Sequence, residues 1–331
     1  MAQKKKFKFS FNLALLLIWV VIFLVIGIAA PSFFNPNYII SVMLKNIVET
    51  GMVALPMTLI IVTGGIDLSV GNIMILACML GGMAAAGTGN GFVGVIVTLI
   101  VGAACGLING LMVAKAKISE MITTLATMYL FLGLARGITG GDSVYAFDFA
   151  SWCGNTMVGP IPIQLIFFAV MAVIFVIVLQ KSTFGRKLFA IGLNKNAARY
   201  AGINVEKMQI IIFTVTGIVC ALASFVYLGR FTSVKYDAGS NFNLNVITIV
   251  VLGGTSIMGG VGDMKGTLLG TLIIATLNSG LTVMNIPINA QTIVQGVVLL
   301  ISLIAFSIVA AREKQRKVIK ITSSEETAAQ Q

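Results

Sequence analysis

Apolar residues fill this chain in long runs that only short polar segments interrupt. A helix needs about 20 such residues to cross the hydrocarbon core of a bilayer. We expect ten spans: residues 11–30, 47–63, 70–87, 91–114, 119–140, 161–180, 208–229, 243–259, 264–284 and 288–310. The pattern predicts an all-α polytopic membrane protein with about ten transmembrane helices, some of them broken by glycines.

Three of the runs, 47–63, 70–87 and 243–259, are short or interrupted by glycines. Backbone that leaves the helical form inside a membrane is tolerated only where protein buries it or where it lines an aqueous cavity. A broken helix or a re-entrant passage is therefore as compatible with these runs as two clean crossings. The count of ten could change by one or two.

Composition agrees with a membrane protein, since 58% of the 331 residues are hydrophobic and 10% are charged. A soluble domain could not bury that much apolar surface. Residues 1–10 are a basic segment, and the first run is longer than the apolar part of a typical signal peptide, so we expect it to be retained. A transmembrane domain follows over 11–311, and the polar tail 312–331 is predicted to be disordered.

Positive charge indicates the orientation, because Lys and Arg near helix ends are retained in the cytoplasm. Ten alternating spans with a cytoplasmic N-terminus place 18 of the 22 Lys and Arg residues inside. The C-terminus is then also cytoplasmic, and so is the loop 181–207. The net charge of +11 is explained by this topology in a lipid membrane, so no nucleic-acid partner is expected.

Several kinds of chemistry are excluded by residue types. The chain has no histidine, and its four cysteines lack metal-ligand or redox spacing, so we expect no metal site and no catalytic residue. The stretches GNGFVG at 89–94 and GGVGDMKGT at 259–267 are glycine-rich but fit no nucleotide-binding motif in register and context. We therefore expect a chain that binds no cofactor and has no ATPase site of its own.

The stretch VTGGIDLSVGN, residues 62–72, places a carboxylate inside an apolar region. An ionised Asp at the centre of a spanning helix costs roughly 2.5–3.5 kcal/mol, so Asp67 needs a donor or a polar cavity. In one interpretation Asp67 caps the next helix from a short cytoplasmic turn. In the other, a broken helix borders the translocation path, whose candidate residues are Thr63, Gly64, Gly65, Asp67, Ser69 and Asn72.

A second glycine cluster, VLGGTSIMGGVGDMKG at 251–266, also has paired glycines after an apolar run. An internal duplication, which is common in transporters, would explain the likeness. Flexible turns between packed helices would explain it equally well. Gly253, Gly254 and Thr255 are further candidates for the path.

Small residues recur at intervals of four at Gly102, Gly106 and Gly110, at Gly133 and Gly137, and at Gly266 and Gly270. This spacing allows helices to approach closely in lipid. We interpret these glycines as sites of helix packing, within the chain or between subunits.

The long cytoplasmic loop contains a short run that favours a helix, KNAARYA, between Asn194 and Gly202. Asn194 is an N-cap residue, and Gly202 suits the position after a helix. Such a short helix is marginal alone. A solvated loop remains possible, but we favour a basic docking helix for a cytoplasmic partner.

Three segments together resemble the signatures of permease subunits of bacterial ABC sugar importers. They are GGIDLSVG at 64–71, GRKLFAIGLNKNAARYAGI at 185–203 and VVLGGTSIMGGVGDMKGTLLGTLI at 250–273. The resemblance covers roughly residues 35–305 and is to systems for ribose, galactose, xylose, rhamnose and autoinducer-2. It implies a permease in the bacterial inner membrane that imports a monosaccharide or a sugar-like molecule.

The resemblance also implies partners. A second permease copy or a homologue, cytoplasmic ABC ATPase subunits that use ATP–Mg, and an extracytoplasmic sugar-binding protein would complete the importer. The segment similar to the coupling segment of such permeases gives the candidate coupling residues Asn194, Asn196, Ala197, Ala198, Arg199 and Gly202. Asn196 stands where the family usually has an acidic residue, which puts the salt bridge of that contact in doubt.

Two other functions compete with import by an ABC system. An ion-coupled carrier would need an ionisable coupling group in the membrane, and Asp67 is the one good candidate. A membrane enzyme is disfavoured without histidine or paired carboxylates. Charged residues in the outer segments 31–46, 141–160 and 230–242, with the nearby Arg136, are candidates for docking the binding protein.

Overall fold

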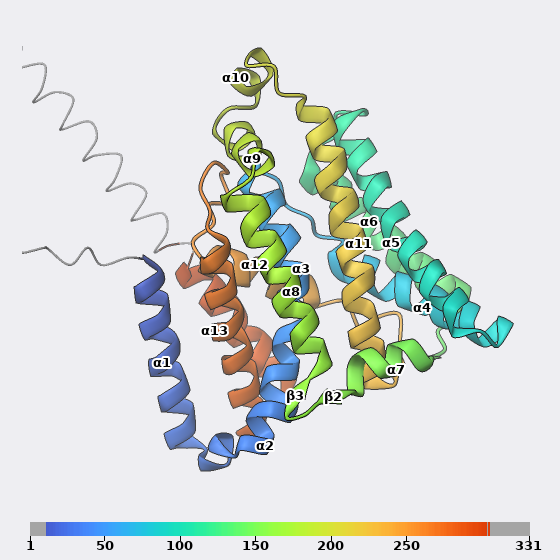
Figure 1. The fold of residues 1–331 in the computed structure, drawn as a ribbon, viewed down its shortest axis with the longest axis vertical. Coiled ribbons are helices and arrows are strands. Elements are labelled where there is room, and N and C mark those ends of the chain that lie inside the picture. The colour runs from blue at the N-terminus through green and yellow to red at the C-terminus, as the bar shows by residue number, and fades with distance from the viewer. Residues whose placement is uncertain (1–10, 303, 305–331) are drawn as a thin grey trace, which may run out of the picture.

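The computed structural model describes residues 11–302 and 304, which form a bundle of apolar helices (Figure 1). Eight helices in this part are long and apolar enough to cross a membrane. They are α1 (Phe11–Ala29), a continuous stretch Pro36–Val62, α4 (Val70–Thr88), α5 (Gly91–Ala114), α6 (Glu120–Thr139), α8 (Ile163–Gln180), α11 (Val205–Phe231) and α13 (Met264–Val283). The predicted all-α polytopic fold is confirmed.

The stretch Pro36–Val62 is built from α2 (Pro36–Tyr38), a π-helical turn (Ile39–Met43) and α3 (Leu44–Val62). A short 3₁₀ helix, Pro31–Phe34, precedes it. Two shorter apolar helices, α12 (Phe242–Leu252) and Ile288–Ser302, complete the set of ten apolar helices that the sequence predicts. Of the last expected span, 288–310, residues 303 and 305–310 lie outside the described part, as do the segments 1–10 and 312–331.

The prediction of one helix over 243–259 is wrong. The helix α12 ends at Leu252, and residues 253–263 form a loop before α13. Eleven residues give a helix of about 16 Å, half the hydrocarbon thickness. Glycines stop the helix, because Gly254 has a φ of +86° that a helix does not allow.

The short elements lie at the two ends of the bundle. The helices α9 (Thr183–Leu193) and α10 (Lys195–Tyr200) form one end, called here the α10 end, while α2 and α7 (Asp148–Asn155) lie at the other (Figure 1). Two antiparallel strand pairs are present: β1 (Val144–Tyr145) with β4 (Ser233–Val234), and β2 (Met157–Val158) with β3 (Ile161–Pro162). In the first pair, Val144 is opposite Val234.

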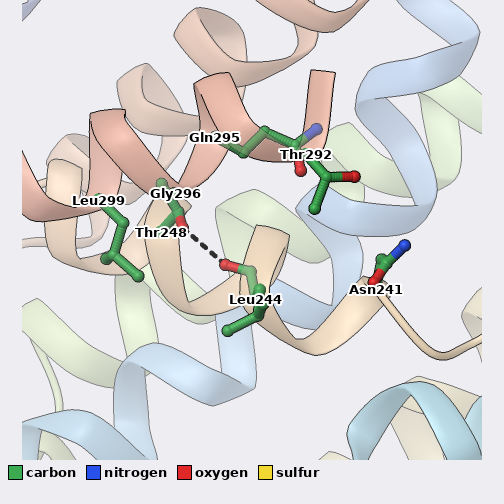
Figure 2. Close-up of a pocket in the computed structure, with 7 residues that line it drawn as sticks. All are labelled: Asn241, Leu244, Thr248, Thr292, Gln295, Gly296 and Leu299. Atoms are coloured by element: carbon green, nitrogen blue, oxygen red, sulfur yellow. Dashed lines mark hydrogen bonds between the residues drawn. The ribbon is translucent and has the colours of Figure 1, made fainter. Parts of the chain in front are cut away.

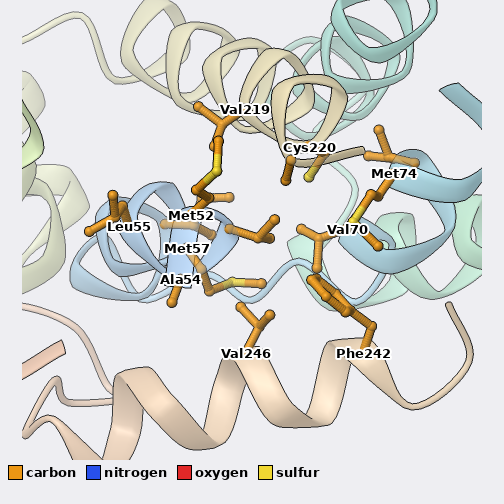
Figure 3. Packing of buried hydrophobic residues seen from close by; sticks show 14 of the residues in the cluster. Met52, Ala54, Leu55, Met57, Val70, Met74, Val219, Cys220, Phe242 and Val246 are labelled. Atoms are coloured by element: carbon orange, nitrogen blue, oxygen red, sulfur yellow. The ribbon is translucent and has the colours of Figure 1, made fainter. Parts of the chain in front are cut away.

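The helix α3 is at the centre of the bundle, and every residue from Gly51 to Val62 is buried. Figure 3 shows Met52 and Met57 of this helix among side chains of its neighbours: Val70 and Met74 of α4, Val219 and Cys220 of α11, Phe242 and Val246 of α12. By contrast, α1 is at the edge and exposes apolar side chains such as Val25 and Ile28. Burial thus separates a protein-facing core from a lipid-facing rim.

Glycines allow the closest helix contacts. A β-carbon on Gly102 or Gly106 of α5 would overlap the backbone of α11 at Gly217 and Phe213. Gly266 and Gly270 of α13 fit against the backbone of α12 in the same way. The packing interpretation is confirmed for these glycines. Gly133 and Gly137 meet nothing within 4 Å among the described residues, so no packing within this part of the chain explains them.

Candidate functional site

Asp67 lies in the loop that joins α3 to α4, and its side chain is fully buried. Its Oδ1 accepts hydrogen bonds from the backbone N–H of Ser69 at 2.8 Å and from the Ser69 hydroxyl at 2.6 Å. The Ser69 hydroxyl also accepts a bond of 2.8 Å from the Asn109 amide of α5. Asp67 therefore closes the turn that starts α4, as a cap does, but inside the protein and not in a solvated turn.

The polar group around Asp67 has unused hydrogen-bonding capacity. Asn72 donates to the Met128 carbonyl oxygen of α6 at 2.7 Å, while its own side-chain oxygen has no partner among the described residues. Asp67 Oδ2 and Asn109 Oδ1 are also buried and unpartnered within the described residues. Buried acceptors are normally satisfied. This group thus keeps three buried acceptor atoms that no described residue satisfies.

The N-terminal ends of α4 and α12 lie in contact. The Asn243 side chain of α12 accepts a hydrogen bond of 2.7 Å from the backbone N–H of Gly71 in the first turn of α4. A β-carbon on Gly71 would lie 2.6 Å from the Gly239 carbonyl oxygen. Both helices therefore begin inside the bundle with their N-terminal ends in contact. In transporters, such half-helix ends commonly border the solute site.

The helix α3 ends in a Schellman motif. The N–H of Gly64 donates to the Ile61 carbonyl at 2.9 Å, and the N–H of Gly65 donates to the Ile60 carbonyl at 3.2 Å. Gly64 supplies the left-handed residue, with a φ of +82°. Thr63 is buried, and its hydroxyl donates a hydrogen bond of 2.7 Å to the Ile60 carbonyl oxygen. These bonds satisfy the backbone carbonyls of Ile60 and Ile61 and so close the end of the helix.

The helix α12 ends in the same motif. The N–H of Gly254 donates to the Val251 carbonyl at 2.9 Å, and that of Thr255 donates to the Val250 carbonyl at 3.2 Å. Thr255 is buried, and its hydroxyl lacks a partner among the residues described. An Asp also precedes the next helix, since Asp263 caps α13 by accepting from the Lys265 N–H at 3.1 Å. The first break, residues 63–69 between α3 and α4, and the second break, residues 253–263 between α12 and α13, therefore share local geometry as well as sequence.

The two breaks are joined directly at the α10 end. The N–H of Gly260, in the loop after α12, donates a hydrogen bond of 2.8 Å to the Val62 carbonyl oxygen at the end of α3. Gly192 of α9 packs onto the same place, where a β-carbon would overlap both the Val62 oxygen and the Gly260 nitrogen. We call Val62, Gly192 and Gly260 the glycine junction.

The predicted short helix exists as α10. Asn194 caps it by accepting from the N–H groups of Asn196 and Ala197, each at 3.0 Å. Gly202 follows with a φ of +81°. Of the six candidate coupling residues, Ala198 is buried, and the exposed ones are Asn194, Asn196, Ala197, Arg199 and Gly202.

An ion pair attaches α10 to the bundle. Lys195 Nζ lies 2.6 Å from Glu120 Oε1 at the start of α6, and Gln209 of α11 donates to the same oxygen at 2.9 Å. The Glu120 side chain also borders the first break, because a β-carbon on Gly65 would lie 3.2 Å from its Cγ. A displacement of α10 would therefore reach the first break through Glu120 and both breaks through the glycine junction.

Arg230, near the end of α11, forms an ion pair inside the protein where a docking role was predicted. We expected its charge to be a candidate for docking a partner, but its Nε lies 3.0 Å from Glu49 Oε1, and its side chain is 17% exposed. It also donates to the Asn46 amide oxygen at 2.6 Å. The charge of Arg230 is used inside the protein, because the buried Glu49 requires a partner.

The sequence pattern does not single out Gly192, Glu120, Asn109 or Asn243, although these residues position the predicted site residues. Gly192 lies inside the quoted segment 185–203, so a local signal was present, whereas Glu120 lies at the start of the expected span 119–140 with no motif beside it. Nothing near Asn109 or Asn243 in the sequence indicates a partner, because their contacts span 40 and 172 residues. Polar amides in apolar runs were the one available clue.

The chain is similar to known permeases over most of its length. The family described as the permease component of the branched-chain amino acid transport system matches residues 38–303. The ribose import permease protein of Bacillus subtilis is 37% identical over 289 residues, which cover 86% of this chain and 89% of that protein. No solved structure matches.

Two further relatives extend this comparison. The ribose import permease protein of Escherichia coli K12 is 35% identical over 294 residues, covering 86% of this chain and 90% of the relative. The autoinducer 2 import system permease protein of Photorhabdus temperata is 35% identical over 321 residues, which cover 94% of this chain and 95% of that protein. The similar region includes both glycine breaks and α10.

Proposed function

Because the chain belongs to the family of the permease component of the branched-chain amino acid transport system, we propose that it is the transmembrane subunit of an ATP-binding cassette importer for a monosaccharide or sugar-like molecule. The similarity to ribose and autoinducer 2 import permeases over 86–94% of the chain carries this proposal. In this proposal the chain spans the bacterial inner membrane with both termini in the cytoplasm, so the α10 end faces the cytoplasm. An extracytoplasmic binding protein delivers the solute to the opposite end.

The energy comes from separate ATPase subunits that bind ATP–Mg and dock at the α10 end. Supporting this, α10 carries the basic residues Lys195 and Arg199, and apolar side chains are exposed beside them. Tyr200 is 94% exposed and Leu193 is 73% exposed. Exposed apolar groups beside charged ones are typical of protein contacts. A second permease copy or a homologue completes the membrane part.

Coupling runs from the ATPase through α9 and α10 to the two breaks. When the ATPase subunits close, they displace α10. The contact of Gly192 with Val62 and Gly260 leaves no space for α9 to move without its neighbours, because packed backbones transmit displacement. The ends of α3 and α12 then shift together. Such a bistable arrangement can alternate between inward and outward openings.

Reconstitution tests this function. The chain is placed in proteoliposomes with its ATPase subunits and binding protein, and uptake of radiolabelled D-ribose, D-xylose and D-galactose is measured. We expect uptake of at least one sugar only when ATP and all partners are present. Uptake by the chain alone under an ion gradient would contradict the proposal and favour a secondary carrier.

A further inference from the structure

A pocket lies between α12 and the last described helix, Ile288–Ser302 (Figure 2). It is lined by Asn241, Leu244, Thr248, Thr292, Gln295, Gly296 and Leu299. Four of these residues have amide or hydroxyl side chains, and none of the seven is charged. The hydroxyls of Thr248 and Thr292 donate to the Leu244 and Ile288 carbonyl oxygens, so they remain available to a ligand as acceptors. The pocket therefore offers neutral polar groups, mainly hydrogen-bond acceptors, beside two leucines.

The last helix has two chemically different faces. Thr292, Gln295 and Leu299 share one face and line the pocket. The other face is apolar and exposed, as at Ile293 with 68% exposure and Val297 with 48%. Polar side chains within membrane-spanning segments turn toward protein or water, because hydrocarbon cannot satisfy them. The pocket side of this helix is therefore the side that faces away from lipid.

A neighbouring helix orients one of the amides. The Gln295 Nε2 donates a hydrogen bond of 2.9 Å to the Asn278 side-chain oxygen of α13. Asn278 lies 14 residues after the start of α13, well inside its length. The amide of Gln295 is thus held in place at a depth where the surrounding helices are apolar.

The start of α12 has more amide groups than its folding requires. Asn243 is used in the contact with Gly71 of α4. Asn241 faces the pocket, and the buried Oδ1 of Asn245 has no partner among the residues that the structure describes. A buried acceptor without a partner calls for an explanation beyond packing. These amides supply hydrogen-bonding capacity around the first turn of a broken helix.

We propose that this pocket is a contact site for the transported solute, which the proposed function takes to be an uncharged polyhydroxyl compound. The inference rests on the proposed function and gives its solute a place in the chain. Amides and hydroxyls both donate to and accept from sugar hydroxyls, and leucines suit the C–H faces of a sugar ring. An amino acid, the solute in the family's description, carries two full charges that need charged or dipolar partners. Neutral side chains line this pocket, which favours the sugar.

Cysteine labelling tests the site without requiring transport. All four native cysteines are buried, so a new thiol is distinguishable in the full-length chain. Gln295→Cys places a thiol in the pocket, and Val297→Cys places a matched thiol on the exposed face of the same helix. Permeabilised membrane vesicles are treated with a charged methanethiosulfonate reagent, which needs water to reach the thiol.

We expect labelling of Gln295→Cys and none of Val297→Cys. We also expect D-ribose, D-xylose or D-galactose to protect Gln295→Cys, and L-leucine not to. Equal resistance of both variants would overturn the aqueous site, and protection by L-leucine alone would overturn the solute class. Thr292→Cys, on the same face, repeats the test if Gln295→Cys does not fold. Since labelling needs no ATPase, sugar protection without ATP-driven uptake would count against the proposed function and not against this site.

Discussion

The backbone N–H of Gly260 donates a hydrogen bond of 2.8 Å to the carbonyl oxygen of Val62, although the two residues lie almost 200 positions apart. This bond joins the loop after α12 to the end of α3. Gly192 of α9 fills the remaining space beside it. The two broken helices and the segment that leads to α10 therefore meet at one point, where a single displacement affects all three.

Asp67 should be replaceable by an amide but not by an aliphatic side chain. Asp67→Asn retains an acceptor for the Ser69 N–H, whereas Asp67→Leu removes it and leaves buried donors unpaired. We expect the Leu variant to lose about 1–3 kcal/mol of unfolding free energy and most of its uptake. Melting temperatures in detergent and sugar uptake would be compared for the two variants. Wild-type behaviour of Asp67→Leu would remove the role assigned to this carboxylate.

The pair formed by Glu49 and Arg230 should behave as a unit. Arg230→Met leaves a buried carboxylate without its partner and should cost about 3–5 kcal/mol. Adding Glu49→Gln to Arg230→Met removes the uncompensated charge and should restore much of this loss. A double-mutant cycle on unfolding free energy checks the coupling. Additive effects of the two substitutions would show that the ion pair at 3.0 Å contributes nothing of its own.

The attachment of α10 should depend on Glu120 and not on Glu206. Glu120 pairs with Lys195 at 2.6 Å and is 15% exposed, whereas Glu206 pairs with Lys115 at 3.2 Å and is 36% exposed. Exposed pairs contribute about 0–1 kcal/mol. Glu120→Ala should therefore reduce uptake per ATP hydrolysed in the reconstituted complex, while Glu206→Ala serves as the control. Equal uptake in both variants would argue against a coupling role for this attachment.

The sequence predicts the spans well because a helix that crosses the hydrocarbon core is apolar over its length, whether protein or lipid surrounds it. Helix α5 has the predicted bounds, 91–114, and α10 follows from its capping residues Asn194 and Gly202. The predicted end of this helix is too late because Ile257 and Met258 extend the apolar run beyond the glycine pair that follows Leu252. There the paired glycines, not the hydropathy, carry the signal.

The contacts that build the site could not be predicted in this way. Hydropathy does not tell which helix packs on which, so the bonds from Asn243 to Gly71 and from Gly260 to Val62 had no counterpart in the sequence pattern. Helix α9 was also missed, because it is amphipathic and lies within a basic loop. The candidate residues lie within the glycine-rich and helix-capping motifs, whereas Asn109 lies in an apolar run outside these motifs.

The role of the glycine junction is tested most directly by measuring uptake and ATP hydrolysis together for Gly192→Ala. A β-carbon there would overlap Val62 and Gly260, which costs about 1–3 kcal/mol of strain in a packed core. Gly87→Ala in α4 is the matched control, since nothing lies within 4 Å of that position among the residues described. We predict that Gly192→Ala continues to hydrolyse ATP with its partners but loses most sugar uptake, while Gly87→Ala retains both. Normal uptake per ATP in a folded Gly192→Ala complex would contradict transmission through this junction.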